Sequence, residues 1–164
     1  TMLTLQRERS VDLWPEIMPL LIEHKEEISF YPDIALDPDV EIYDKCEDIG
    51  ILRCYTARMR GELIGYAIFK VSPNMHYKQS VQANQDVLFV TKPYRKGRIG
   101  LQLIRYATAR LGAEGIQVEY QHVKAGEQIR EALAALPGRT DVGALMERLG
   151  YELVDLIYAK RLDR

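Results

Sequence analysis

Hydrophobic and polar residues recur with a helical period in some segments of the chain and alternate as in strands in others. Two longer segments show the helical period most clearly. Apolar positions recur every three to four residues up to Ile28, after Ser10 or Asp12 as N-cap. A second helix is predicted over 99–112, with an apolar face that consists of Leu101, Ile104, Ala107 and Leu111. Residues 51–60 and 62–71 have the alternating pattern of strands, and the turn at 60–61 predicts that they form a hairpin.

Shorter elements complete the pattern. Helices are expected at 39–46 (with Asp39 as N-cap), 126–135 and 141–149, and a polar loop at 72–84. Further strands are expected at 3–9, 85–90, 116–123, 151–154 and 156–162. A helix joins strand 85–90 to strand 116–123, so these two strands are predicted to be parallel. The sequence therefore predicts a mixed α/β fold.

Length and composition are those of one globular domain spanning 1–164. The 164 residues are 47% hydrophobic and 28% charged, and no repeat or linker divides them. Two cysteines, Cys46 and Cys54, and three histidines with no CxxC pair argue against a disulfide scaffold or a zinc module. No apolar run reaches the length of a membrane span and the first residues lack a signal-peptide core, so a cytoplasmic location is expected.

Charge is distributed unevenly along the chain. Residues 1–50 hold thirteen acids and four bases, a net charge of −9, so the remainder carries +7 within the total of −2. Residues 91–110 contain six bases and no acid. This asymmetry favours two ligands of opposite sign.

The most informative segment is VLFVTKPYRKGRIGLQLIRYA, which reads as a strand, a basic turn and a helix. Backbone N–H groups at a helix N-terminus attract anions such as a pyrophosphate. Arg95, Lys96 and Arg98 add positive charge to this turn, and Gly97 and Gly100 allow a close backbone approach. The segment contains neither a P-loop nor a GxGxxG motif, and a solvated basic loop is the alternative interpretation.

YRKGRIG after LFV resembles the acetyl-CoA-binding motif [RQ]-x-x-G-x-[GA] of the GNAT superfamily of N-acetyltransferases. The hairpin GELIGYAIFKV and the ending LMERLGYELVDLIYAKRL are also similar to that family. Counted from Arg95, the first motif glycine falls on Arg98, Gly100 matches the second, and Gly97 comes one place early. The resemblance implies a single-domain GNAT-like α/β fold, with helices on both faces of a mixed, mostly antiparallel sheet of about six to seven strands.

The resemblance also implies where acetyl-CoA, the acetyl donor, would bind. In such enzymes the strand before the basic turn separates from its parallel neighbour, and pantetheine pairs with backbone groups in the gap. Those groups would belong to Leu88, Phe89 and Val90, and one N–H would face the thioester oxygen. Residues 95–100, Ile99 among them, would hold the pyrophosphate.

The residues that would move protons are less clearly indicated. A protonated primary amine, with a pKa near 10, must lose a proton before it attacks. Asp86, His76 and His122 are candidate bases, each with a structural role as the alternative. Met146 stands where the family has a general-acid tyrosine, and Tyr120, Tyr151 and Tyr158 could substitute for that tyrosine by residue type.

Seven acids lie within residues 33–48, in the segment that commonly forms a wall of the acceptor site in GNAT proteins. They favour a cationic amine acceptor, and a solvated acidic surface is the alternative interpretation.

The leading hypothesis is direct transfer of acetyl from acetyl-CoA to a primary amine, without a metal. The second is a catalytically impaired acyl-CoA-binding sensor or interaction module. A nucleic-acid binder is the weakest, since 91–110 has few stacking aromatics. No membrane partner is expected, and a homodimer is left open.

Overall fold

The computed structural model describes residues 2–28, 31–138 and 142–164. The chain divides into two compact units, Thr1–Gln121 with Ala159–Arg164, and His122–Tyr158. A single domain over 1–164 stays a prediction. Within the described ranges, no helix is both long enough and apolar enough to cross a lipid bilayer.

Twelve elements follow one another along the described chain. The first unit contains β1 (Leu3–Arg7), α1 (Ser10–Ile28), α2 (Val40–Asp48), β2 (Leu52–Met59), β3 (Glu62–Pro73), β4 (Val81–Val90), the 3₁₀ turn η1 (Lys92–Tyr94) and α3 (Ile99–Ala113). They are followed by β5 (Val118–Lys124), α4 (Glu127–Ala134), α5 (Val142–Arg148) and β6 (Asp155–Arg161).

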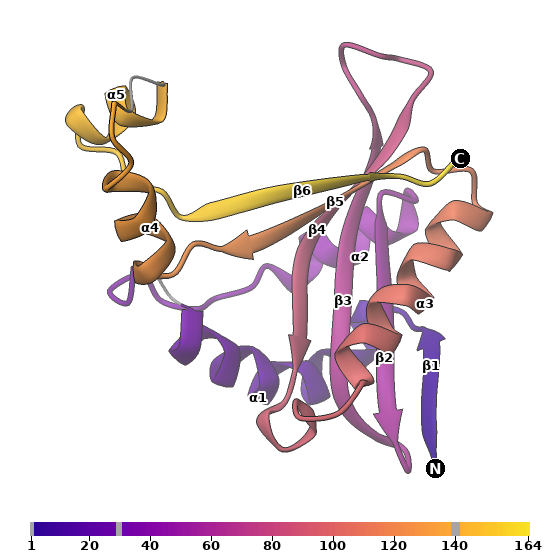
Figure 1. Ribbon diagram of the computed structural model, residues 1–164. Coiled ribbons are helices and arrows are strands. Elements are labelled where there is room, and N and C mark those ends of the chain that lie inside the picture. The colour runs from indigo at the N-terminus through magenta and orange to yellow at the C-terminus, as the bar shows by residue number, and fades with distance from the viewer. Residues whose placement is uncertain (1, 29–30, 139–141) are drawn as a thin grey trace. The chain divides into compact units, whose positions relative to one another are not determined.

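The strands form one six-stranded sheet in the order β1-β2-β3-β4-β5-β6. Pairing is antiparallel from β1 to β4 and parallel between β4 and β5. α3 covers one face of the sheet, and α1 and α2 cover the other (Figure 1). The predicted α/β class, the mostly antiparallel sheet, the parallel pair and the helices on both faces are confirmed, with six strands.

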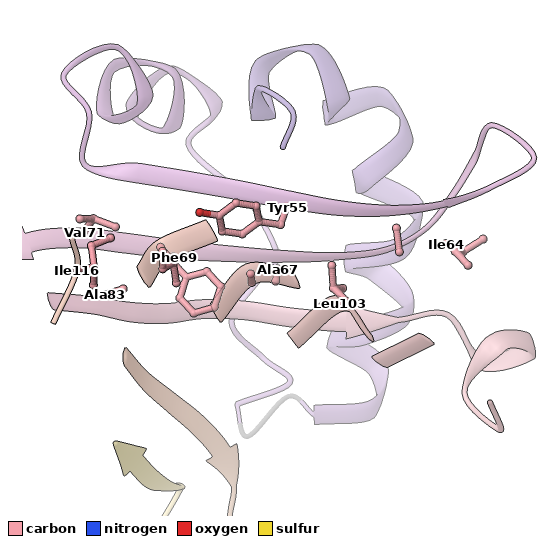
Figure 2. Packing of buried hydrophobic residues seen from close by; sticks show 11 residues of the cluster. Tyr55, Ile64, Ala67, Phe69, Val71, Ala83, Leu103 and Ile116 are labelled. Atoms are coloured by element: carbon pink, nitrogen blue, oxygen red, sulfur yellow. The ribbon is translucent and has the colours of Figure 1, made fainter. Parts of the chain in front are cut away.

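Two hydrophobic clusters, one on each face, hold the first unit together. Alternate side chains of β2 point to opposite faces, so that Tyr55 packs under α3 while Cys54 packs under α1. Figure 2 shows Tyr55, Ala67, Phe69 and Leu103 in the α3 cluster, whose sheet side chains alternate with those of the other cluster.

The buried face of α3 differs by one position from the predicted one. Leu103, Ala107 and Leu111, spaced four apart and therefore aligned along the helix, are completely buried. Leu101, which the sequence pattern places on the buried face, is 46% exposed. That part of the prediction is wrong, because Leu101 lies two residues, or about 200°, around the helix from Leu103.

Two other boundaries also differ from the sequence prediction. Residues 81–84, assigned to a polar loop, form the first part of β4, because Ala83 is buried under α3 and Gln82 is held by Asn74. Residues 151–154 form no strand. Asp39 caps α2 as predicted, accepting a bond from the Ile42 N–H at 3.0 Å. The first residue of predicted helix 141–149 lies outside the described residues.

Candidate active site

A β-bulge in β4 sets the position of Asp86. Ile68 lies opposite Val87 and Phe69 lies opposite Gln85, so that Asp86 is the extra residue on β4. A bulge of this kind changes the direction of a side chain and is often found beside functional sites. Asp86 is thereby turned toward the α1 and α2 face of the sheet, where its carboxylate meets α2.

β4 continues beyond its pairing with β5. The parallel ladder covers three pairs and ends where Asn84 lies opposite Tyr120. Within the described ranges, residues 85–90 have no ladder partner in β5. This is the edge of β4 on which the resemblance expects pantetheine, although the Val90 carbonyl already accepts a bond from Arg95 Nε at 2.6 Å.

The hydrogen-bond pattern between β3 and β4 shows which of those groups point outward. The Thr91 N–H donates to the Ile64 carbonyl at 2.9 Å, and antiparallel partners alternate between bonded and non-bonded pairs. By this alternation the Phe89 backbone turns toward β3, and the Leu88 and Val90 N–H groups turn away from it. Of the three residues expected to meet pantetheine, Leu88 and Val90 direct their N–H groups away from β3, and their contact with a ligand stays a prediction.

Gly65 allows β3 and β4 to approach closely at this place. A Cβ added at Gly65 would lie 2.9 Å from the Phe89 carbonyl oxygen and 3.1 Å from a Val90 methyl carbon. Any larger residue must therefore displace the backbone of β4, so this glycine helps to set the position of the outward-facing N–H groups.

The turn between η1 and α3 has the donors needed for a phosphate. From Lys96 to Leu101, the backbone N–H groups donate no hydrogen bond to any residue that the structure describes. A Cβ added at Gly97 would meet no atom within 4 Å, so the space in front of the turn is open. Lys96 is exposed beside it. These features fit a pyrophosphate group at the start of α3.

The Arg95 side chain contacts α1 and β4 in this structure. Its guanidinium binds the Glu27 carboxylate through two nitrogens, at 2.9 and 3.0 Å, and its Nε donates to the Val90 carbonyl at 2.6 Å. It also lies over the Phe89 ring, 5.2 Å from the centroid. Hydrogen bonding to Arg95 holds the pKa of Glu27 below its usual value. Arg95 therefore attaches the turn to α1.

Glu23 makes a second attachment one helical turn earlier. Its carboxylate accepts bonds from the Thr91 hydroxyl at 2.9 Å and from the Lys92 N–H at 3.2 Å. Sequence analysis missed both α1 glutamates. Glu23 and Glu27 are four residues apart and therefore lie on one side of the predicted helix. That spacing could have indicated a shared partner, but it could not show that the partner is the basic turn.

Arg98 points to another part of the first unit. Its side chain lines a cavity that β1, β2 and α3 enclose, and it makes no hydrogen bond or ion pair with a described residue. In this conformation neither the Arg95 nor the Arg98 side chain is directed at the open turn, so their expected contact with the pyrophosphate stays a prediction.

A cavity of about 350 Å³ lies against the α1 and α2 face of the sheet, beside the bulge. Its walls come from α1, the segment before α2, α2 itself, β3 and β4. The lining residues are Trp14, Leu21, Ala35, Leu36, Asp37, Pro38, Tyr43, Ile68, Asp86 and Val87. The cavity is thus mostly apolar with two carboxylates, which suits a small molecule bearing a cationic group.

Asp86 is the most strongly held polar group of this cavity. Its carboxylate accepts a bond from the Tyr43 hydroxyl at 2.6 Å and lies 3.4 Å from the Lys70 ammonium. Burial, and then the bond to Asp86, raise the pKa of Tyr43, so its hydroxyl remains a donor at neutral pH. Trp14 packs edge-on against the Tyr43 ring, with centroids 5.1 Å apart.

Most of the acidic segment makes contacts within the protein. Asp44, Glu47 and Asp48 lie within 2.8 to 3.6 Å of Arg9, and Glu41 pairs with Lys45 at 2.9 Å. Asp37 is the member that lines the cavity. Asp37 has no ion-pair partner among the described residues, whereas the Asp86 carboxylate shares its charge with Lys70 at 3.4 Å.

The other predicted proton-transfer residues are divided between the two units. His76 is exposed in the loop before β4, and His122 belongs to the second unit, where its Nδ1 lies 3.8 Å from Asp155. Met146 lies in α5 of that unit and is 37% exposed. Tyr120 ends the β4–β5 ladder in the first unit. Across the described ranges, no three His, Cys, Asp or Glu side chains form a metal-binding group.

Neither a protein-family model nor a curated protein matches this sequence, but solved structures do. An aminoglycoside 6'-N-acetyltransferase complexed with coenzyme A superposes with a TM-score of 0.63, at 16% identity over 98% of both chains. A PaiA N-acetyltransferase from Thermoplasma acidophilum in complex with coenzyme A gives 0.60, at 15% identity over 98% of this chain and 99% of that one. The chain has the GNAT N-acetyltransferase fold.

An aminoglycoside acetyltransferase from an uncultured soil metagenomic sample, in complex with sisomicin, shares the GNAT fold at a TM-score of 0.60. It has 19% identity over 85% of this chain and 91% of that one. At such identities the likeness defines the fold, and the substrate has to be argued from this chain's own residues.

Proposed function

We propose that this protein is an N-acetyltransferase that moves the acetyl group of acetyl-CoA to a cationic primary amine. One observation carries the proposal. Asp86, at the bulge, lines the cavity that contains carboxylates, and the outward-facing N–H groups of Leu88 and Val90 follow it on the same strand. All three residues lie within the five-residue stretch 86–90 of β4. A donor site and an acceptor site can therefore meet on β4.

The turn would bind the donor through its free backbone N–H groups and Lys96. The thioester would lie along the open edge of β4, where the N–H of Leu88 or Val90 can donate to the carbonyl oxygen. A hydrogen bond that strengthens as this oxygen becomes negative lowers the barrier by about 3 kcal/mol.

Asp86 and Asp37 would draw the ammonium group of the acceptor into the cavity. Asp86, held in place by Tyr43, would then accept a proton from the amine directly or through one water. The amine nitrogen forms a bond to the acetyl carbon, the carbon–sulfur bond breaks, and coenzyme A leaves as the thiol after taking up a proton.

The test is release of free thiol from acetyl-CoA in the presence of primary amines that differ in charge. Thiol release should depend on the amine and be faster with 1,4-diaminobutane than with the uncharged-tail amine butylamine. Asp86→Asn should lower kcat at least 100-fold without changing acetyl-CoA affinity. Asp12→Asn, in the first turn of α1 and outside the cavity, is the matched control.

Coenzyme A binding with no amine-dependent thiol release would overturn the catalytic proposal. That outcome would favour the second candidate, an acyl-CoA-binding module. The position of Arg95, bound to Glu27 rather than directed to the open turn, is the observation that favours it.

A further inference from the structure

We propose a second ligand site in the first unit, between α3 and the edge strand β1, that binds a small amphipathic anion such as a medium-chain carboxylate. The site is a cavity of about 600 Å³, within the size range of small-molecule sites. It is lined by Leu3, Leu5, Met59, Arg98, Ile99, Gln102 and Tyr106. Its residues are separate from those of the cavity at Asp86.

The cavity follows from how α3 lies on the sheet. α3 packs mainly on β2, β3 and β4 through the stripe that contains Leu103, Ala107 and Leu111. The neighbouring stripe of Ile99, Gln102 and Tyr106 then faces the edge strand. Side chains of β1 and β2 on that face are left partly exposed beneath it.

Four apolar side chains form one part of the wall. Leu3 lies opposite Met59 in the β1–β2 ladder, and Leu5 is two residues along on the same face. Together with Ile99, these side chains pack against the α3 cluster while keeping a partly exposed surface. They offer an apolar chain a surface on which to lie.

Three polar side chains, Arg98, Gln102 and Tyr106, form the rest of the wall, and Arg98 is the charged one. Within the part of the chain that the structure describes, the side chains of Arg98, Gln102 and Tyr106 make no hydrogen bond or ion pair. Among the residues described in the structure, no aspartate or glutamate lines the cavity. A carboxylate head group beside Arg98, with its tail on the leucines, would match both charge and polarity.

The test uses sodium octanoate and neutral octan-1-ol with the coenzyme-A-free protein, followed by ¹⁵N–¹H NMR titration. Octanoate should bind at least tenfold more tightly than octanol and shift the amides of β1 and the first two turns of α3. Arg98→Gln should remove that preference. Lys96→Gln, on the same turn but outside the cavity, should keep it. Gln102→Trp, which fills the groove from an exposed position, should weaken both ligands.

Equal affinity for octanoate and octanol in the unchanged protein would overturn the proposal. So would a preference that survives Arg98→Gln, shifts that map elsewhere, or binding to anionic phospholipid vesicles without binding to octanoate. Because coenzyme A is left out, the result is independent of whether the protein transfers acetyl groups.

Discussion

The contact between the basic turn and α1 can be broken by changing either Arg95 or Glu27, and we expect the two changes to lower stability by different amounts. Arg95→Gln removes the bidentate contact with Glu27, the bond to the Val90 carbonyl and the contact with the Phe89 ring. Glu27→Gln removes only the negative charge that Arg95 binds in the bidentate contact, and it leaves the other two contacts of Arg95 in place. The two variants should therefore differ in stability, although they break the same ion pair.

The size of each effect follows from burial and geometry. The Arg95 and Glu27 side chains are 37% and 22% exposed, so their pair is worth about 1 kcal/mol after solvent screening. The bond from the charged Nε to a carbonyl adds about 1 to 1.5 kcal/mol and the ring contact about 0.5 kcal/mol. Each 1 kcal/mol changes Tm by about 2–4 °C at this size. Together these contributions are about 2.5–3 kcal/mol, so Arg95→Gln should lower Tm by about 5–12 °C and Glu27→Gln by about 2–4 °C.

The assay is thermal unfolding of both single variants and the double variant, with Glu26→Gln as the matched control. Glu26 makes no side-chain bond to a described residue. The pKa of Glu27 is lowered in the folded protein, so its stabilisation is present above the usual value of 4.5 and is lost as pH falls through the folded value. The difference between the wild-type protein and Glu27→Gln should shrink as the pH falls below 4.5 and vanish once the pH lies below the folded pKa of Glu27. Equal losses in the two variants at pH 7, or no coupling in the double variant, would refute this reasoning.

Three further variants test the active-site account. Gly65→Ala should displace β4, lower the free energy of unfolding by about 1–3 kcal/mol and weaken acetyl-CoA binding in calorimetry, because the added Cβ meets a backbone oxygen. Asp37→Asn should raise KM for a diamine and flatten its rise with salt at saturating acetyl-CoA, while Glu41→Gln, whose partner is Lys45, should not. Tyr43→Phe removes the donor to Asp86 and should lower kcat about tenfold with KM for acetyl-CoA unchanged.

Much of the fold could be predicted because periodicity records which face of an element is buried. The alternation of 51–71 predicted the hairpin, and Asp39 was recognisable as a cap. β4 was predicted too short because Gln82 and Asn84 look like loop residues, whereas Gln82 is buried and bonded to Asn74 in the folded chain. Burial of a polar side chain with its partner cannot be seen in local hydropathy.

The site was predicted less completely, for a related reason. The segment from Leu88 to Gly100 was expected to bind the donor from its basic turn and the family resemblance, and Asp86 was one of three candidate bases, beside His76 and His122. What the sequence could not show was which cations are already paired, because Glu27 lies sixty-eight positions from Arg95. The bulge that turns Asp86 into the cavity likewise arises from register between strands, which composition does not encode.

The proposed function requires acetyl-CoA to bind along the open edge of β4 and the turn before α3. A ¹⁵N–¹H NMR titration of the full chain with acetyl-CoA tests this binding mode. We expect the largest shifts on the amides of Leu88, Val90 and residues 96–101. Saturable binding that leaves these amides unshifted while moving those of other segments would contradict it.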